Sequence, residues 1–373
     1  MIGINVDRKE VVISEKSINN YAQAFVDSNF EQRLIENIKP ISQHYLAACL
    51  HHMFATGIFD ELTQQEHAIP IASLAEKLEL DINRVTGFFL FLANENVVVV
   101  ENDKVILTPQ GQQYGEFKAW YTIMIGGYSS TVQQIGLALF EGSPFCSRDG
   151  RYVGLGSCEM SRFDGMPITK TLLSRAKLKC KEMLDLGCGN ALYLVDFCRH
   201  MPELKAWGVE PNLGGYNEAC TLVKDTNMAD RIRLYNRSTT EFIHNPPADC
   251  QPDLMVLGFV LHEILAQEGK EAVIGLLRLI IQRFKKINIV VIEVINEIDN
   301  PKFMRHGLAK NFWNPYYLLH YFTLQKLEKK SFWEAVFESA GLRVIDLITT
   351  DQNVDSSGLE LGYLLRSKSE GNR

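Results

Sequence analysis

The sequence predicts an α/β protein in which a largely parallel, doubly wound sheet of seven strands follows a mainly helical N-terminal domain. Apolar segments of strand length alternate with helical patterns between residues 183 and 366. A glycine-containing turn follows the first of these segments, at residues 185–191. Three helical patterns and a hairpin pattern occupy residues 41–109. These three observations define the predicted architecture.

The first predicted domain, residues 1–111, begins with a short strand and an amphipathic helix. Helical spacing and then hairpin alternation follow in the segments 41–62, 71–78, 82–93, 97–100 and 105–109. This order of elements is typical of a winged helix. A DNA-recognition helix presents Arg, Lys, Asn or Gln to base edges, whereas the third helix offers one arginine, Arg84, among mostly aromatic and aliphatic residues. The sequence therefore favours burial of this helix over DNA binding.

Residues 112–175 are expected to connect the domains and to cover the substrate. A helical stretch from Trp120 to Leu139 is interrupted by two glycines, and an irregular region is expected from Gly142 to Cys158. A long loop with aromatic residues inside a compact chain is usually functional. The third predicted domain, residues 176–373, carries the sheet. Its predicted strands are 183–187, 206–210, 231–236, 253–258, 287–294, 342–348 and an antiparallel closing strand, 359–366.

Composition restricts the partners of the protein. The chain has 373 residues, 46% of them apolar and 22% charged, and a net charge of −7, which gives no electrostatic footprint for nucleic acid or anionic membrane. The apolar stretch Leu276–Ile295 is interrupted by charged residues, so it is not a membrane span. No signal peptide is visible, and the eight cysteines form no C-x-x-C pair. We therefore expect reduced thiols and a cytoplasmic location.

The turn at residues 185–191 is the strongest functional signal. Asp185 ends an apolar strand, Gly187 and Gly189 follow, and Glu210 ends the next strand. Glycines allow close approach of a ligand to the backbone, and an acid after the second strand is placed to bind ribose hydroxyls. A dinucleotide fingerprint would have a third glycine where this chain has Leu192. The alternative is an ordinary strand–helix turn.

The pattern D-x-G-x-G-x-A followed by this acid resembles motif I of the class I S-adenosylmethionine-dependent methyltransferases. The resemblance implies a Rossmann-like fold and S-adenosylmethionine as cofactor. It also implies that the N-terminal domain forms a homodimer, as in small-molecule methyltransferases. Gly258, after the fourth strand, is assigned to the same site. Many members have an acid after the third strand for the adenine amino group; this chain has Asn236-Arg237-Ser238, so Ser238 or Asn236 is expected there.

Two histidines indicate the chemistry. His262 comes just past the fourth strand, where ligands of open α/β sheets bind. In O-methyltransferases a histidine at this place is a general base, and in the metal-containing C-methyltransferases of aryl-pyruvates it binds a metal ion. The second metal-binding histidine of those enzymes corresponds to His320, and their carboxylate-binding arginine to Arg148. Imidazole and oxygen ligands suit iron or another transition-metal ion. Each residue also has a purely structural alternative. His262 could cap or pack beneath the next helix, His320 could belong to an aromatic cluster, and Arg148 could form a surface ion pair.

Residues Gly154–Met160 and Asn314–Glu328 resemble the 2-ketoarginine methyltransferases, which methylate C3 of 5-guanidino-2-oxopentanoate on the route to β-methylarginine in natural products. The resemblance implies a 2-oxo acid substrate and an enolate formed with Glu263 or a metal-bound hydroxide as base. Carboxylates that could bind the guanidinium group are Asp149, Glu159, Asp164 and Glu263. The competing hypotheses are an O-methyltransferase with His262 as general base, a transcriptional regulator, and a cofactor-binding pseudo-enzyme.

Overall fold

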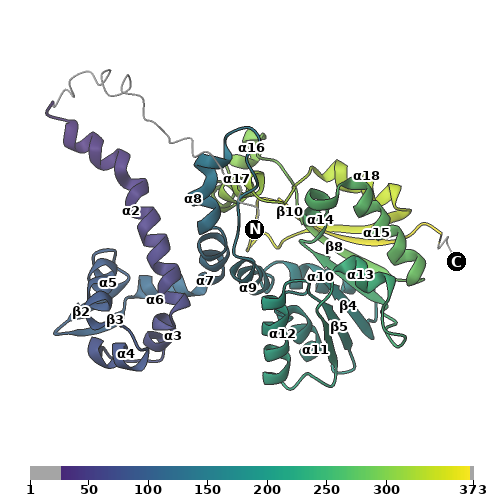
Figure 1. Ribbon diagram of the computed structural model, residues 1–373, viewed down its shortest axis with the longest axis horizontal. Helices are drawn as coiled ribbons and strands as arrows, with labels where there is room; N and C mark the ends of the chain where they lie inside the picture. The colour runs from purple at the N-terminus through teal and green to yellow at the C-terminus, as the bar shows by residue number, and fades with distance from the viewer. Residues whose placement is uncertain (1–26, 370–373) are drawn as a thin grey trace, which may run out of the picture. The chain divides into compact units, whose positions relative to one another are not determined.

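The computed structural model describes residues 27–369 (Figure 1). The chain divides into two compact units, one up to Ala47 and one from Ala48 onward, and each is considered by itself. The short strand predicted at the start of the chain lies outside the described residues. The predicted domain boundaries at residues 111 and 175 remain an interpretation of the sequence.

The helical part of the chain has the predicted order of elements. Its elements are α2 (Phe30–Ala55), α3 (Ile58–Thr63), β1 (Ile69–Pro70), α4 (Ile71–Lys77), α5 (Ile82–Asn94), β2 (Val98–Glu101), β3 (Lys104–Leu107), α6 (Pro109–Glu116), α7 (Lys118–Tyr121) and α8 (Ser129–Ala138). The helix predicted at 41–62 has other ends in the structure. Helix α2 begins at Phe30 and runs through Pro40. It ends at Ala55, before Gly57, whose φ of 78° lies in the left-handed region. Asn102 and Asp103 form the hairpin turn with φ of 49° and 58°, as a two-residue turn requires.

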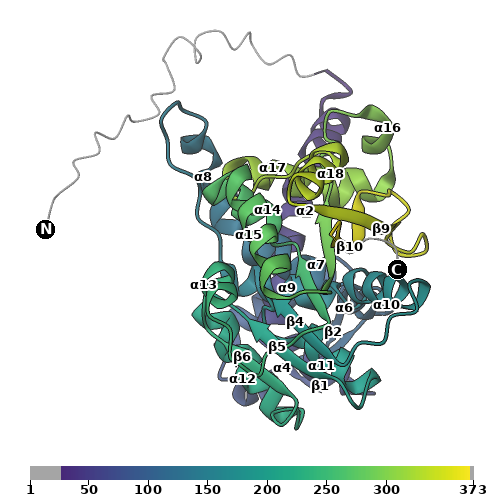
Figure 2. The same ribbon diagram turned by 90° about the vertical axis from the view of Figure 1, so that its right-hand side faces the viewer.

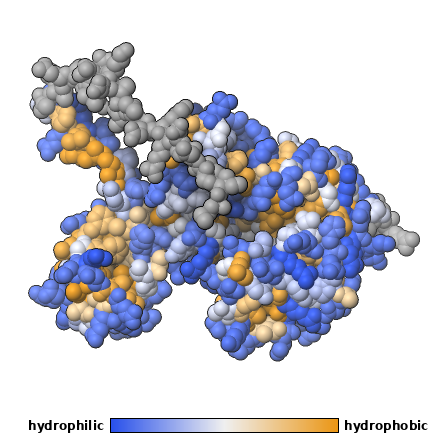
Figure 3. All heavy atoms as spheres, in the orientation of Figure 1, coloured by the Kyte–Doolittle hydropathy of each residue, from blue (hydrophilic) through white to orange (hydrophobic). Residues whose placement is uncertain are grey.

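Exposed apolar side chains gather on α2 (Figure 3). They recur at helical spacing: Leu34, Ile35, Ile38, Ile41 and Tyr45. The expectation that α5 is buried holds only for one face. Val85, Phe89 and Leu92 are buried, whereas Ile82 and Leu90 are 43% and 52% exposed.

The expectation of an irregular region from Gly142 to Cys158 is wrong for its second half, which is a helix. Helix α9 (Gly150–Met160) begins at Asp149, whose carboxylate accepts from the backbone N–H groups of Arg151 and Tyr152. Its glycines lower helix propensity but allow close packing, because a Cβ on Gly156 would lie 2.6 Å from atoms of Ile123. Ile123 belongs to η1 (Thr122–Gly127), a π-helical turn at the predicted glycine interruption.

The seven predicted strands form one sheet in the order β6-β5-β4-β7-β8-β10-β9. They are β4 (Glu182–Leu186), β5 (Lys205–Val209), β6 (Ile232–Tyr235), β7 (Leu254–Gly258), β8 (Asn288–Val294), β9 (Leu342–Thr349) and β10 (Glu360–Ser367). β10 is antiparallel to its neighbours, as predicted, and lies between β8 and β9. Figure 2 shows β10 beside β9. The strand order changes direction between β4 and β7, so a crevice for a ligand is expected at their carboxyl ends.

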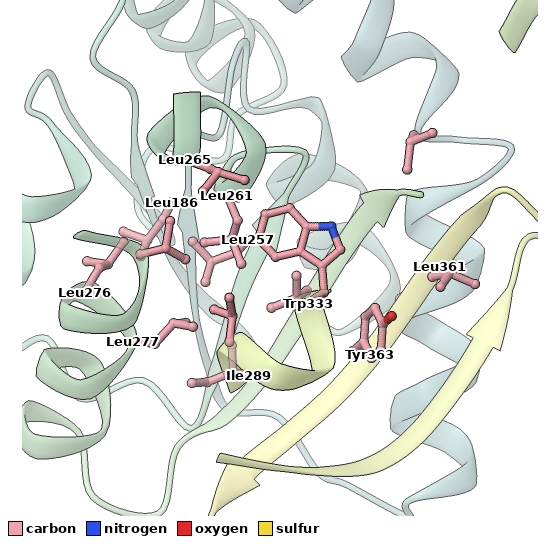
Figure 4. Packing of buried hydrophobic residues seen from close by; sticks show 14 of the residues in the cluster. Leu186, Leu257, Leu261, Leu265, Leu276, Leu277, Ile289, Trp333, Leu361 and Tyr363 are labelled. Carbon is pink, nitrogen blue, oxygen red and sulfur yellow. The ribbon is translucent and has the colours of Figure 1, made fainter. Parts of the chain in front are cut away.

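Helices cover both faces of the sheet, as alternating strands and helices require. They are α10 (Gly165–Arg175), α11 (Leu192–His200), α12 (Leu213–Asp225), α13 (Thr239–His244), α14 (Leu261–Glu268), α15 (Lys270–Arg283) and α18 (Lys330–Ser339). An insertion before α18 carries α16 (Pro301–Met304), η2 (Ala309–Trp313) and α17 (Asn314–Phe322). Met183 packs in one apolar cluster with α10 and α11, whereas Leu184 packs in the other with α14, α15 and α18. Figure 4 shows part of this second cluster, with Trp333 of α18 beside Leu257 and Leu261.

Within residues 27–369, no helix has the length and apolar character needed to cross a membrane.

Candidate active site

The turn after β4 has the left-handed backbone conformation that its glycines predict. Gly187 and Gly189 have φ of 87° and 54°, in the left-handed region. A Cβ on Gly187 would lie 2.6 Å from Val260 Cγ2, and one on Gly189 would lie 2.6 Å from Cys158 Sγ. Both positions therefore need glycine for space as well as for conformation. The backbone N–H groups of Gly187 and Cys188 donate to Val209 O at the end of β5, which holds the turn beside the next strand.

Glu210 connects this turn with the loop after β5. Its carboxylate accepts from the N–H of Gly189 at 2.9 Å and from the N–H of Asn212 at 2.7 Å. The side chain is buried, which raises the pKa of Glu210, and the two backbone hydrogen bonds oppose this shift. A carboxylate has further lone pairs, so Glu210 can accept two ribose hydroxyls in this position.

A cavity of about 370 Å³ opens above the carboxyl ends of β4 and β7. Most predicted site residues line it, namely Arg148, Gly187, Gly189, Glu210, Ser238, Gly258, His262 and Glu263. Asp185 and His320 are not among the lining residues. Asp185 is buried, and burial together with the charge of Glu210 raises its pKa to about 7.

The structure distinguishes the two residues predicted for the adenine contact. Asn236 donates its amide N–H groups to the carbonyls of Glu210 and Pro211, so it holds the loop after β5. Ser238 lines the cavity and begins α13 with a capping box shared with Glu241. Ser238 is thus the one of the two placed to contact a ligand.

His262 is the second residue of α14, and a buried carboxylate holds its side chain. Its Nδ1 is 2.8 Å from Glu293 Oε2 of β8, and both side chains are buried. Burial disfavours the charged imidazole, but the charge and hydrogen bond of Glu293 outweigh it and raise the pKa of His262. In the neutral ring the proton is on Nδ1, so the Nε2 lone pair is available to a ligand.

His320 of α17 has the same arrangement with a different partner. Its Nδ1 is 2.8 Å from the carbonyl oxygen of Tyr316, so Nδ1 carries the proton and Nε2 has a free lone pair. This Nε2 is buried and has no hydrogen-bond partner. Burial, together with the neighbouring His262, lowers the pKa of His320 well below its ordinary value. The rings of His262 and His320 have their centroids 5.5 Å apart.

Arg148, Glu263 and Gln325 form a polar cluster in front of His262. Arg148 Nη2 lies 2.8 Å from Glu263 Oε1, and Gln325 donates its amide N–H to the same oxygen at 3.1 Å. Tyr128 donates its hydroxyl to Gln325 Oε1 at 2.8 Å. Arg148 Nη1 is buried without a partner, which leaves N–H donors free for an anionic ligand such as a carboxylate.

The histidine pair has the donor set of a transition-metal site. A ligating histidine usually donates its other N–H to a carboxylate or a backbone carbonyl, as His262 and His320 do. Among residues 27–369, no three or more His, Cys, Asp and Glu side chains are grouped to hold a metal ion, so further ligands would come from substrate or solvent. The amide of Gln325 is 3.5 Å from His262 Nε2 and would have to move aside. With that change, the residues fit a metal bound by two imidazoles.

Several site residues were not predicted from the sequence. Glu293 had a detectable signal, because it is an acid within the apolar strand Val290–Val294. No sequence signal pointed to the other site residues, which are Gln325, Tyr128 and Trp313. Of the carboxylates predicted for a guanidinium group, Asp164 and Glu263 line the cavity, whereas Asp149 caps α9 and Glu159 does not line it.

Comparisons with known proteins show the family and the fold of the chain. No family model matches the chain. A 2-ketoarginine methyltransferase from Streptomyces arginensis is 35% identical over 91% of this chain and 98% of its own length. Human N-acetylserotonin methyltransferase, solved in complex with S-adenosylmethionine, has a TM-score of 0.62 at 16% identity, covering 93% of this chain and 99% of that one. Mitomycin 7-O-methyltransferase has a TM-score of 0.58 at 16% identity, covering 90% of this chain and 98% of that one.

The glycine turn, the acid after β5 and the seven-stranded sheet with one antiparallel strand define an S-adenosylmethionine-dependent methyltransferase of class I. The solved structures share this fold. Because of the sequence identity over nearly its whole length, the chain belongs to the family of the 2-ketoarginine methyltransferase.

Proposed function

We propose that the protein transfers a methyl group from S-adenosylmethionine to C3 of a 2-oxo acid, and that this acid is 2-ketoarginine (5-guanidino-2-oxopentanoate). The observation that carries the proposal is the pair of buried imidazoles near Arg148 whose Nδ1 atoms contact protein acceptors, which leaves the Nε2 lone pairs for a ligand. A 2-oxo acid presents a carboxylate for the guanidinium and a keto oxygen for the histidine side of the cavity. The relationship to a 2-ketoarginine methyltransferase supports the choice of substrate. The methylated product would then lead to β-methylarginine for a peptide natural product.

The residues divide the reaction between them. Arg148 would bind the substrate carboxylate through the free Nη1, and Tyr128 and Gln325 would hold Arg148 and Glu263 in place. Glu263 would accept the C3 proton, which leaves an enolate whose C3 attacks the methyl carbon of S-adenosylmethionine. The C–S bond breaks as the C–C bond forms, and S-adenosylhomocysteine leaves as the neutral thioether. Positioning of the two reactants supplies much of the rate.

Iron or another transition-metal ion held by His262 and His320 would act as a Lewis acid that polarises the keto group. Glu293 and the Tyr316 carbonyl orient the two rings for this role.

The test is a methyl-transfer assay with a panel of 2-oxo acids, 2-ketoarginine included, read by mass spectrometry with and without chelator. We expect a mass gain at C3 of 2-ketoarginine that chelation lowers and added iron(II) restores. Failure to methylate any 2-oxo acid contradicts the proposed reaction. If the purified protein contains no metal and chelator leaves methylation unchanged, only the metal role is contradicted.

The Nδ1 contact of His262 with Glu293 also favours a second candidate, a small-molecule O-methyltransferase in which His262 is the general base. In this case the base takes the proton of a hydroxyl acceptor, and His320 has no role. Metal-independent methylation of a hydroxylated aromatic compound would support this candidate. Loss of that activity on chelation would argue against it.

We propose further that the protein is a homodimer that uses its N-terminal helices. The exposed apolar side chains of α2, at helical spacing, are the supporting observation. Replacement of Ile38 and Ile41 by aspartate is expected to convert a dimer of the 42.3 kDa chain into a monomer. Sedimentation velocity measures this change. A monomeric wild-type protein contradicts the proposal.

A further inference from the structure

Three buried carboxyl groups meet beside the cavity, on the side of β10. Asp164 precedes α10, Asp355 lies in the loop before β10, and Glu360 is the first residue of β10. They are 6%, 6% and 2% exposed. Asp164 and Glu360 line the same cavity as His262 and Arg148. Carboxylates brought together in this way repel one another unless a cation lies between them.

The ion pairs recorded among residues 27–369 include none of these three carboxyl groups. Glu360 Oε1 is buried with no hydrogen-bond partner. Burial and the neighbouring acids raise the pKa of Glu360 well above its ordinary value, and burial with the charge of Asp355 raises that of Asp164 to about 7. A buried carboxyl oxygen without a hydrogen-bond partner is costly, so Glu360 Oε1 indicates a missing ligand.

Asp355 differs from Glu360 because both of its carboxylate oxygens accept hydrogen bonds, and Asp164 Oδ1 accepts from the backbone N–H of Gly165. It accepts from the indole N–H of Trp313 at 2.8 Å and from the backbone N–H of Ser357 at 2.7 Å. This contact orients Trp313, whose ring lines the cavity together with that of Phe312. Aromatic side chains that line a cavity together with an unpartnered carboxyl oxygen, that of Glu360, are suited to a flat cation.

The position of Glu360 relates this end of the cavity to the reaction centre. Glu360 pairs with Val294 of β8, and Val294 directly follows Glu293, which holds His262. Glu360 is thus one strand further along the sheet than Glu293, which holds His262. Glu360 and His262 line the same cavity.

We infer that Glu360 and Asp164 form a recognition site for the distal guanidinium group of the substrate, with Trp313 against its face. The inference rests on the proposed function for the identity of the 2-oxo acid. A guanidinium group has five N–H donors in one plane and can satisfy both carboxylates at once. Glu360 and Asp164 would therefore select the substrate, whereas Arg148, His262 and Glu263 act on its 2-oxo end.

The test compares binding of two nearly isosteric compounds, cationic 5-guanidino-2-oxopentanoate and neutral 5-ureido-2-oxopentanoate. Calorimetry with the full-length protein and S-adenosylhomocysteine measures binding without turnover. We expect wild type to bind the guanidino compound at least about tenfold more tightly. Glu360→Gln should abolish this preference and leave ureido binding unchanged. Asp164→Asn keeps an oxygen that accepts from the N–H of Gly165, and it should reduce the preference. This variant replaces Glu360→Gln as the test if Glu360→Gln does not fold.

Glu182→Gln is the control, because Glu182 is an acid of the same sheet bound by Trp207 and Gln251 outside the cavity. It should keep the wild-type preference. Equal binding of the two compounds by wild type, or a preference that survives in Glu360→Gln, overturns the inference. Selective guanidino binding without methylation of any 2-oxo acid contradicts the proposed function only. Methylation without selectivity contradicts the inference only.

Discussion

His262→Asn is expected to lower the turnover number for methyl transfer by about 10³-fold, within the range for removal of a group that acts on the reacting atoms. The asparagine amide can still donate to Glu293 from near the position of Nδ1, so the buried carboxylate keeps a partner and the fold is preserved. Only the Nε2 lone pair is removed. Steady-state kinetics, with the melting temperature as a check on folding, measures the effect.

His320 separates the two candidate reactions. In the 2-oxo acid reaction, His320→Asn should lower both activity and bound transition metal, measured by elemental analysis. In the O-methyltransferase reaction it should change neither. His244→Ala, an exposed histidine on α13, is the matched control and should behave as wild type. Full activity in His262→Asn would rule out both roles assigned to this residue.

Glu210→Ala is expected to raise the Kd for S-adenosylmethionine by at least about 100-fold. The reason is the loss of two hydrogen bonds between a carboxylate and ribose hydroxyls, each worth about 1.5–3 kcal/mol, where about 1.4 kcal/mol corresponds to a factor of ten. The variant also frees the N–H groups of Gly189 and Asn212, which loosens the turn. Isothermal titration calorimetry with S-adenosylmethionine and S-adenosylhomocysteine measures both affinities.

Glu218→Ala provides the comparison for Glu210. Glu218 lies on the following helix, α12, and pairs with Arg151 near the surface. Removing it should leave the Kd unchanged, because surface ion pairs contribute little. An unchanged Kd in Glu210→Ala would place the ribose elsewhere and contradict the assignment of this acid.

The sheet could be predicted from the sequence because buried parallel strands are apolar runs. β4 was expected at 183–187 and is found at 182–186, and the other strands are similarly close. The left-handed conformation of Gly187 and Gly189 was also predictable, because it depends on the local sequence of the turn. Helix α9 was not predictable, because its glycines argue against a helix and its stability comes from packing against Ile123 of η1.

The sequence by itself determined the class of fold and the glycine turn at Asp185–Ala191, and it singled out Glu210 and His262 as candidate site residues. These signals are local: an apolar strand, a glycine conformation, or a polar residue just after a strand. His320 and Arg148 became candidates through the family resemblance. Only the tertiary structure decided the partners of these residues. Glu293 meets His262 because β7 and β8 are neighbours, and Glu360 meets Asp164 because β10 folds back between β8 and β9. Contacts between distant segments depend on strand order, which no local pattern encodes.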